Sequence, residues 1–256
     1  MCLIVLAIEK HPEYPLVILA NRDEFYQRPT RPLHAWPEAP EMLAGKDLEK
    51  GGTWAAWHRD GRFAALTNIR RPGALQSGLR SRGEIPLEFI RRQISPVAYA
   101  RQIEGMTDEY APFNMIYGSV EQLYYISSDA LTPIPLEKGF HGLSNAALDK
   151  QWPKVAYACR RLEECLRTSS HVSTEALFEC MLRVKPFPDE KLPETGVPKE
   201  WERTLSAPFI VSKEYGTRST LLLLVDREGR LQLSERTYKR NLGPRFFSER
   251  TYLQAS

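Results

Sequence analysis

Short apolar runs separated by polar turns dominate the N-terminal part of this chain, a pattern typical of antiparallel strands. The first run, Cys2 to Ile8, is followed by a turn at Lys10 to Pro15 and by a second run, Leu16 to Ala20. This spacing predicts a hairpin. With the turn centred near residue 11 or 12, Cys2 is expected to lie opposite Asn21 and one diagonal step from Asp23.

Three further pairs of strands are predicted from the same pattern. The first of these pairs is joined by Asp60-Gly61, a dipeptide typical of tight hairpin turns. The predicted strands are residues 51–57 and 62–67, 115–118 and 123–127, and 218–225 and 231–237. The proline-rich segment Gln27 to Lys50, which precedes these strands, is predicted to be a long loop.

Helical spacing of apolar residues is found in the middle of the chain. It predicts helices within residues 84–104, from Trp152 to Leu166, and from Ala176 to Val184 behind Ser173 as the N-cap. Residues 185–208, which include five prolines, are predicted to form a linker over one edge of the fold. Hairpins with helices between them predict an α+β fold, with antiparallel sheets covered by helices on their outer faces.

The composition is that of a single soluble domain covering residues 1–256, with 42% hydrophobic residues to form its core. A net charge of +3 is too small to indicate nucleic-acid binding. The clusters Arg70-Arg71 and Arg80 to Arg82 are interpreted as solvated loops, with a site for a substrate anion as the alternative. The apolar N-terminus is too short for a signal peptide or a transmembrane segment, so a cytoplasmic protein is expected.

The four cysteines form no C-x-x-C pair, so neither a zinc site nor a dithiol redox site is expected. Cys2 differs from the others because it follows Met1 directly. Removal of Met1 would give Cys2 a free α-amino group, of ordinary pKa about 7.7–8.0, beside a thiol of pKa about 8.5. The amine can accept the thiol proton, so a single residue would supply both nucleophile and base. A buried, inert cysteine in an interior strand is the alternative interpretation.

Polar side chains follow several predicted strands and are candidates to complete a site around this thiol. Asn21, Asn68 and Asn145 each follow an apolar run, and Arg218 opens a late strand. Side-chain amides can donate to a developing oxyanion, Asp23 can hold the ammonium form of the α-amino group, and Arg218 can lower the thiol pKa. The alternative is that each asparagine satisfies backbone groups at a turn and that the arginine is a surface cation.

Six ordered motifs resemble the N-R-D-E family, which is the family of transport and Golgi organisation protein 2. They are Met1-Cys2, Asn21-Arg22-Asp23-Glu24, Gly51-Gly52-Thr53-Trp54, Ala65-Leu66-Thr67-Asn68, Gly142-Leu143-Ser144-Asn145 and Gly216-Thr217-Arg218. The resemblance extends from Cys2 to the last predicted hairpin, which is essentially the whole chain.

That family is in turn similar to N-terminal-nucleophile hydrolases, especially the branch of bile-salt and penicillin-V acylases. The resemblance implies a four-layer αββα sandwich of antiparallel sheets. It implies that Cys2 is the nucleophile and that Asp23 binds its amine. It also implies oxyanion or positioning roles for Asn68 and Asn145, and it matches Arg218 to the late-strand arginine of those acylases.

One departure from the acylase pattern concerns the early arginine. In those acylases an arginine stands three residues before the aspartate, where this chain has Ala20, and here Arg22 is adjacent to the aspartate instead. Arg22 is therefore expected to play a different part, and with Asn21 it is a candidate for substrate binding. Trp54 is the third candidate, as a wall of an apolar cleft, with core packing as the alternative.

The leading hypothesis is a cofactor-free hydrolase that cleaves a small linear amide or an acyl ester or thioester. The alternative is a non-catalytic trafficking or binding protein of the same fold. For that alternative the resemblance implies secretory organisation and, in some members, lipid metabolism and haem handling. The histidines show no ligand spacing and are interpreted as surface or capping residues: His11, His34, His58, His141 and His171.

Overall fold

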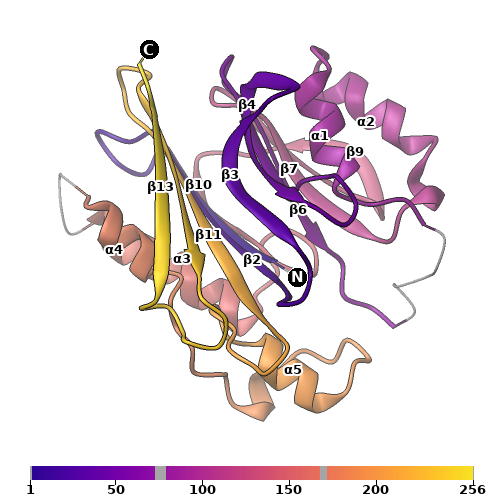
Figure 1. Ribbon diagram of the computed structural model, residues 1–256, viewed down its shortest axis with the longest axis vertical. Coiled ribbons are helices and arrows are strands. Elements are labelled where there is room, and N and C mark those ends of the chain that lie inside the picture. Colours follow the sequence, from indigo (N-terminus) through magenta and orange to yellow (C-terminus); the bar gives the residue numbers. More distant parts are fainter. Residues whose placement is uncertain (1, 73–78, 168–171, 256) are drawn as a thin grey trace. The chain divides into compact units, whose positions relative to one another are not determined.

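The computed structural model describes residues 2–72, 79–167 and 172–255 (Figure 1). These residues form two compact units, each built on one antiparallel sheet. Unit 1 consists of Met1–Gln27, Glu137–Ser144 and Leu148–Ser256, and unit 2 consists of Arg28–Leu136 and Asn145–Ala147.

Unit 1 contains a six-stranded sheet in the order β10-β1-β2-β11-β12-β13. Its strands are β1 (Cys2–Ile8), β2 (Leu16–Phe25), β10 (Gly139–Leu143), β11 (Tyr215–Val225), β12 (Leu231–Tyr238) and β13 (Phe247–Gln254). Residues 3–7 and 16–20 are buried without interruption. Such continuous apolar runs are typical of strands that are buried on both faces, which explains why β1 and β2 lack alternation.

Helices α3 (Pro153–Arg167) and α4 (Thr174–Glu179) belong to the same unit. Helix α3 packs against β1 and β10, and α4 packs against β11. The predicted N-cap of α4 is confirmed, because the Ser173 side chain accepts a hydrogen bond from the Ala176 N–H at 3.2 Å. Helix α5 (Lys199–Leu205) and the 3-10 turn η2 (Asp189–Lys191) lie in the segment that was expected to be a linker.

Unit 2 contains a seven-stranded sheet whose strands follow one another in chain order. They are β3 (Thr30–Trp36), β4 (Ala39–Asp47), β5 (Ala55–His58), β6 (Arg62–Asn68), β7 (Phe113–Ser119), β8 (Leu123–Ser127) and β9 (Ala130–Pro135). Helix α1 (Glu84–Arg91) packs against β5 and β6, and α2 (Pro96–Glu104) packs against β9, with the 3-10 turn η1 (Thr107–Glu109) after it. In the core of this unit, the ring centroids of Phe89, Tyr99 and Tyr117 lie 5.0–6.2 Å apart.

The predicted α+β fold with antiparallel sheets is confirmed. Each unit has a sheet layer with a helical layer against it, which gives the two sheet layers and two helical layers that the resemblance implies. The three later hairpins are present as β5–β6, β7–β8 and β11–β12. Gly61 and Gly229, in two of the connecting turns, have φ of +92° and +77°, which only glycine adopts without strain.

The prediction of a long loop from Gln27 to Lys50 is wrong, because this segment forms the β3–β4 hairpin. Prolines are tolerated there for local reasons. β3 is an edge strand, and Pro32 lies where its pairing with β4 shifts register between Arg31 and His34. A missing backbone N–H is not costly at such a position.

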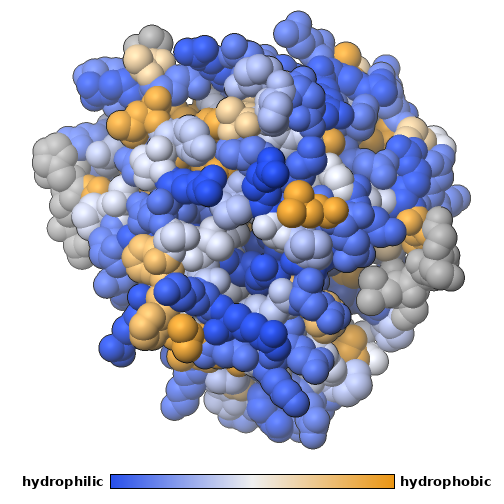
Figure 2. Space-filling model, in the orientation of Figure 1, coloured by the Kyte–Doolittle hydropathy of each residue, from blue (hydrophilic) through white to orange (hydrophobic). Residues whose placement is uncertain are grey.

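The face of the molecule shown in Figure 2 is mostly hydrophilic, with apolar residues scattered in small groups. Among the described helices, none combines the length and the apolar character needed to cross a bilayer.

Candidate active site

The position of Cys2 in the sheet is set by the first hairpin. Its closing pair is Ile8 with Leu16, and counting back along both strands pairs Cys2 with Arg22. The prediction that Cys2 lies opposite Asn21 is therefore wrong by one residue. The pairs of the hairpin are centred on residue 12 rather than between residues 11 and 12, so every pair moves by one position.

Asp23 is the residue of β2 that follows the partner of Cys2. In a mature chain that begins with Cys2, the α-amino group would lie at the start of β1, beside Asp23. The side chain of Asp23 is 1% exposed, and its Oδ1 accepts a hydrogen bond from Thr217 Oγ1 at 2.6 Å. Burial raises the pKa of Asp23, whereas the charge of Lys154 and the hydrogen bond from Thr217 lower it. The structure thus places a buried carboxylate next to the start of β1.

Lys154 is a charged residue that the sequence analysis did not identify. It lies in the first turn of α3 and is only 2% exposed. The sequence did contain a signal for its burial. Lys154 precedes Ala158 and Leu162 by four and eight residues, so it lies on the apolar face of the predicted helix. A lysine in such a stripe is expected to have a buried partner.

The Asn21 side chain is fully used within unit 1. Its Nδ2 donates to the backbone oxygens of Met181 and Pro208, at 3.3 and 2.9 Å. Its Oδ1 accepts from Thr220 Oγ1 at 2.6 Å, and Thr220 accepts in turn from the Tyr238 hydroxyl. These contacts favour the structural interpretation of Asn21 over substrate binding, because no amide group is left for a ligand.

Arg22 and Arg218 lie close enough for their charges to interact. Arg22 is 5% exposed, and Arg218 lies in a β-bulge of β11 between Thr217 and Ser219. Arg218 Nη1 donates to the backbone oxygen of Phe25 at 2.9 Å. Burial lowers the pKa of Arg218, and the charge of Arg22 lowers it further. Two neighbouring guanidinium groups are suited to binding a carbonyl oxygen or a carboxylate.

Asn68 and Asn145 are brought together in unit 2. Asn68 is the last residue of β6, and Asn145 follows β10 by two residues. Asn145 Nδ2 donates to the backbone oxygen of Asn68 at 2.8 Å, and the Arg70 N–H donates to the backbone oxygen of Asn145 at 2.8 Å. Asn145 is 1% exposed, whereas Asn68 is partly exposed. Asn145 therefore holds the end of β6, and Asn68 carries the more accessible amide. Oxyanion roles for both remain predictions.

Trp54 packs within unit 2. A Cβ atom added at Gly45 would lie 2.2 Å from Trp54 Cη2, so the ring occupies the space that this glycine leaves. The backbone oxygen of Trp54 accepts a hydrogen bond from the Leu66 N–H at 2.8 Å. These contacts are those of the packing alternative, and substrate binding by Trp54 remains a prediction.

In the part of the chain that the structure describes, no three His, Cys, Asp or Glu side chains gather as a metal site. His11, His34, His58 and His141 each use a ring nitrogen in a hydrogen bond to the protein. The hydrogen bond to Asp149 holds the pKa of His141 above its ordinary value. His171 lies outside the described residues.

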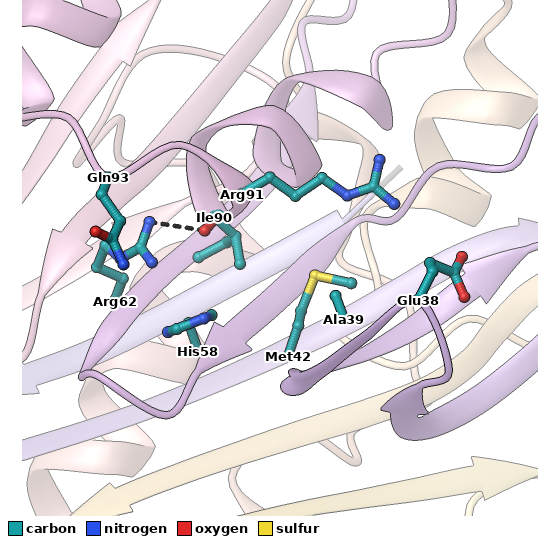
Figure 3. A pocket seen from close by; sticks show the side chains of 8 residues that line it. All are labelled: Glu38, Ala39, Met42, His58, Arg62, Ile90, Arg91 and Gln93. Atoms are coloured by element: carbon teal, nitrogen blue, oxygen red, sulfur yellow. Dashed lines mark hydrogen bonds between the residues drawn. The ribbon is translucent and has the colours of Figure 1, made fainter.

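A pocket of about 330 Å³ lies in unit 2 and is lined by none of the predicted site residues. Figure 3 shows Met42 and Ile90 among its apolar residues, with the side chains of Arg62, His58 and Gln93 around them. Arg62 Nη1 donates to the backbone oxygens of Ile90 and Arg92, at 2.7 Å each. The Arg62 guanidinium thus binds backbone oxygens at the C-terminal end of α1. The residues that line the pocket include no candidate nucleophile.

Comparison with known proteins gives one family match and several relatives. Residues 1–240 match the family described as Transport and Golgi organisation 2. The Transport and Golgi organization protein 2 homolog of Bos taurus is 30% identical, and that of Homo sapiens is 29% identical, each with 93% of both chains covered. The Transport and Golgi organization protein 2 of Drosophila melanogaster is 27% identical over 93% of this chain and 92% of its own.

Two solved structures are similar at low sequence identity. One is a Caenorhabditis elegans N-acylethanolamine-hydrolyzing acid amidase ortholog, with a TM-score of 0.44, 13% identity, and 87% of this chain and 92% of that chain covered. The other is the mutant C2A conjugated bile acid hydrolase from Clostridium perfringens, with a TM-score of 0.41, 8% identity, and coverage of 100% and 92%.

Proposed function

This chain belongs to the Transport and Golgi organisation 2 family, and from that premise we propose that it hydrolyses a linear amide, ester or thioester bond, with Cys2 as the nucleophile once Met1 is removed. The observation that carries the proposal is the buried Asp23, one residue past the strand partner of Cys2. A carboxylate at this position suits an α-amino group that must be held and oriented.

The proposed reaction balances with this chain's own groups and water. Cys2 Sγ attacks the acyl carbon and forms a C–S bond while the α-amino group takes the thiol proton. The bond to the leaving group then breaks, and the α-ammonium returns its proton to the departing nitrogen, oxygen or sulfur. Water attacks the thioester, with the α-amino group again as base, and release of the acid restores the thiol.

Other residues have proposed roles in this scheme. Arg22 and Arg218 would bind the acyl group, and the proximity of their two positive charges supports this role. The side-chain amides of Asn68 and Asn145 are the proposed oxyanion and positioning groups, on the basis of the family motifs. The reaction needs no cofactor. A reducing, cytoplasmic location is part of the proposal, because such a compartment keeps a nucleophilic thiol reduced.

The test is hydrolysis of a panel of acyl amides, esters and thioesters by the wild type and by Cys2→Ala and Cys2→Ser, each with its intact mass measured. We expect Cys2→Ala to lose activity by on the order of 10³-fold or more, because no other group replaces a covalent nucleophile. Cys159→Ala is the matched control, since burial raises the pKa of the Cys159 thiol to about 12 and keeps it inert. Undiminished hydrolysis by Cys2→Ala would remove Cys2 from the mechanism. No turnover by wild type lacking Met1 would favour the trafficking or binding alternative.

A further inference from the structure

A buried lysine in the first turn of α3 is the least expected charge in unit 1. Lys154 is 2% exposed, and α3 packs against β1 and β10. Val155 and Ala158 on the same helix are buried as well. Removing an ammonium group from water is costly, and proteins tolerate it where an opposite charge lies near.

The opposite charge is the carboxylate of Asp23. The charge of Lys154 lowers the pKa of Asp23, which is 1% exposed and accepts a side-chain hydrogen bond from Thr217. Asp23 in turn follows the strand partner of Cys2. One buried carboxylate therefore lies within range of the Lys154 charge and next to the position of the Cys2 α-amino group.

We propose that Lys154 is a positioning residue that neutralises Asp23 and so keeps the α-amino group of mature Cys2 in its uncharged, proton-accepting form. This inference rests on the proposed function, because it assigns the control of the base in that reaction. Asp23 can then orient the amine through a hydrogen bond without stabilising it as an ammonium ion.

The direction of the effect follows from the signs of the charges. A nearby carboxylate alone raises the pKa of an amine, because it stabilises the ammonium form, and a nearby ammonium lowers it. With Lys154 present the two effects oppose each other. Removing Lys154 therefore strengthens the effect of Asp23, so the α-amino group stays protonated to a higher pH.

The other charged groups near the start of β1 are the same with and without Lys154, so they do not change the direction of its effect. Arg218 adds positive charge from β11, as Arg22 does from β2. The Glu24 carboxylate is partly exposed and accepts a hydrogen bond from the Phe25 N–H. On β10, His141 is paired with Leu6, four residues along β1 from Cys2, and it is held by Asp149. The charged groups on the elements packed against β1 are Arg22, Asp23 and Glu24 on β2, His141 on β10, and Lys154, Arg160, Arg161, Glu163, Glu164 and Arg167 on α3.

The first measurement is the pH dependence of kcat/KM for Lys154→Met, which removes the charge and keeps the length, with Lys154→Arg as the charge-retaining control. We expect the acidic limb in Lys154→Met to move to higher pH by on the order of one unit, so that the rate falls about tenfold at neutral pH and recovers at high pH. Lys154→Arg should keep the wild-type midpoint. A purely structural role would instead lower the rate by the same factor at every pH, and that result would overturn the proposal.

The second measurement does not depend on turnover. In the Cys2→Ala background, with and without Lys154→Met, the α-amino group is labelled by brief exposure to acetic anhydride from pH 6 to 10, and the N-terminal peptide is quantified by mass. We expect Lys154→Met to move the labelling midpoint upward by a similar amount. Equal midpoints would overturn the inference. A shifted midpoint without hydrolysis of any substrate would support it and refute the proposed function. Lys154→Gln, checked by circular dichroism, replaces Lys154→Met if the latter does not fold.

Discussion

At the scale of single residues, two threonines of β11 hold the two buried polar side chains of β2. Thr217 donates to Asp23 Oδ1 and Thr220 donates to Asn21 Oδ1, both at 2.6 Å. The spacing of two between Asn21 and Asp23 is matched by a spacing of three between the threonines, because the β-bulge at Arg218 adds a residue to β11. The bulge thus permits both hydrogen bonds.

Thr217→Val should destabilise the protein by about 1–3 kcal/mol, because it removes one hydrogen-bond partner from each of two buried groups. Besides its bond to Asp23, Thr217 Oγ1 accepts a hydrogen bond from the Ile210 N–H at 2.8 Å. Burial already raises the pKa of Asp23, and loss of the Thr217 donor raises it further. A carboxyl group with a raised folded-state pKa loses stability as pH rises from its unfolded to its folded pKa, so the defect should be larger at pH 7 than at pH 4. Urea unfolding at both pH values measures this. Thr217→Ser, which keeps the hydroxyl, should stay near wild type, and a similar loss in both variants would contradict the explanation.

At the scale of elements, the sequence pattern predicted strands with continuous apolar runs and missed strands whose apolar residues are sparse or interrupted by prolines and polar residues. The hairpins β5–β6, β7–β8 and β11–β12 were predicted because their apolar runs are buried. β9 and β13 have mainly exposed side chains and give no hydrophobic signal. For the site, the position of Cys2 and the polar residues of β2 were visible in the sequence. The register of β1 against β2 and the partner of Lys154 depend on turn length and helix packing, which periodicity does not encode.

The contact between α3 and β10 depends on a glycine. A Cβ atom at Gly142 would lie 2.4 Å from Val155 Cγ1 and 2.7 Å from Cys159 Sγ, so Gly142→Ala should cost about 1–3 kcal/mol through overpacking. Gly139→Ala, in the same strand, is the control, because its Cβ would meet His141 Nε2 at 3.5 Å, an ordinary contact. Denaturant midpoints with unchanged m-values measure the difference. Equal effects of the two substitutions would show that α3 does not need the space over Gly142.

At the scale of the whole molecule, arginines of both basic clusters are bound within unit 2. Arg71 pairs with Asp129 at 2.8 Å, and Arg80 pairs with Glu109 at 2.9 Å. Arg82 Nη1 donates to the backbone oxygen of a proline in the same unit. These contacts favour the interpretation of the clusters as surface structure over an anion site, although residues 73–78 between them lie outside the described residues.

Stability should also be distributed unevenly over the sheet of unit 1. β11 lies between two partner strands and is buried along almost its whole length, whereas β13 pairs only with β12 and exposes most of its side chains. Local opening is favoured where little apolar surface is buried, so amide hydrogens of β13 should exchange faster than those of β2 and β11 by on the order of 100-fold or more. Hydrogen–deuterium exchange followed by peptide mass spectrometry measures this, with β12 expected to be intermediate. Equal protection of β13 and β11 would contradict this and would mean that the edge strand opens only when the whole sheet unfolds. The ion pair between Arg236 of β12 and Glu249 of β13, at 2.7 Å, would then be the contact that holds the edge strand.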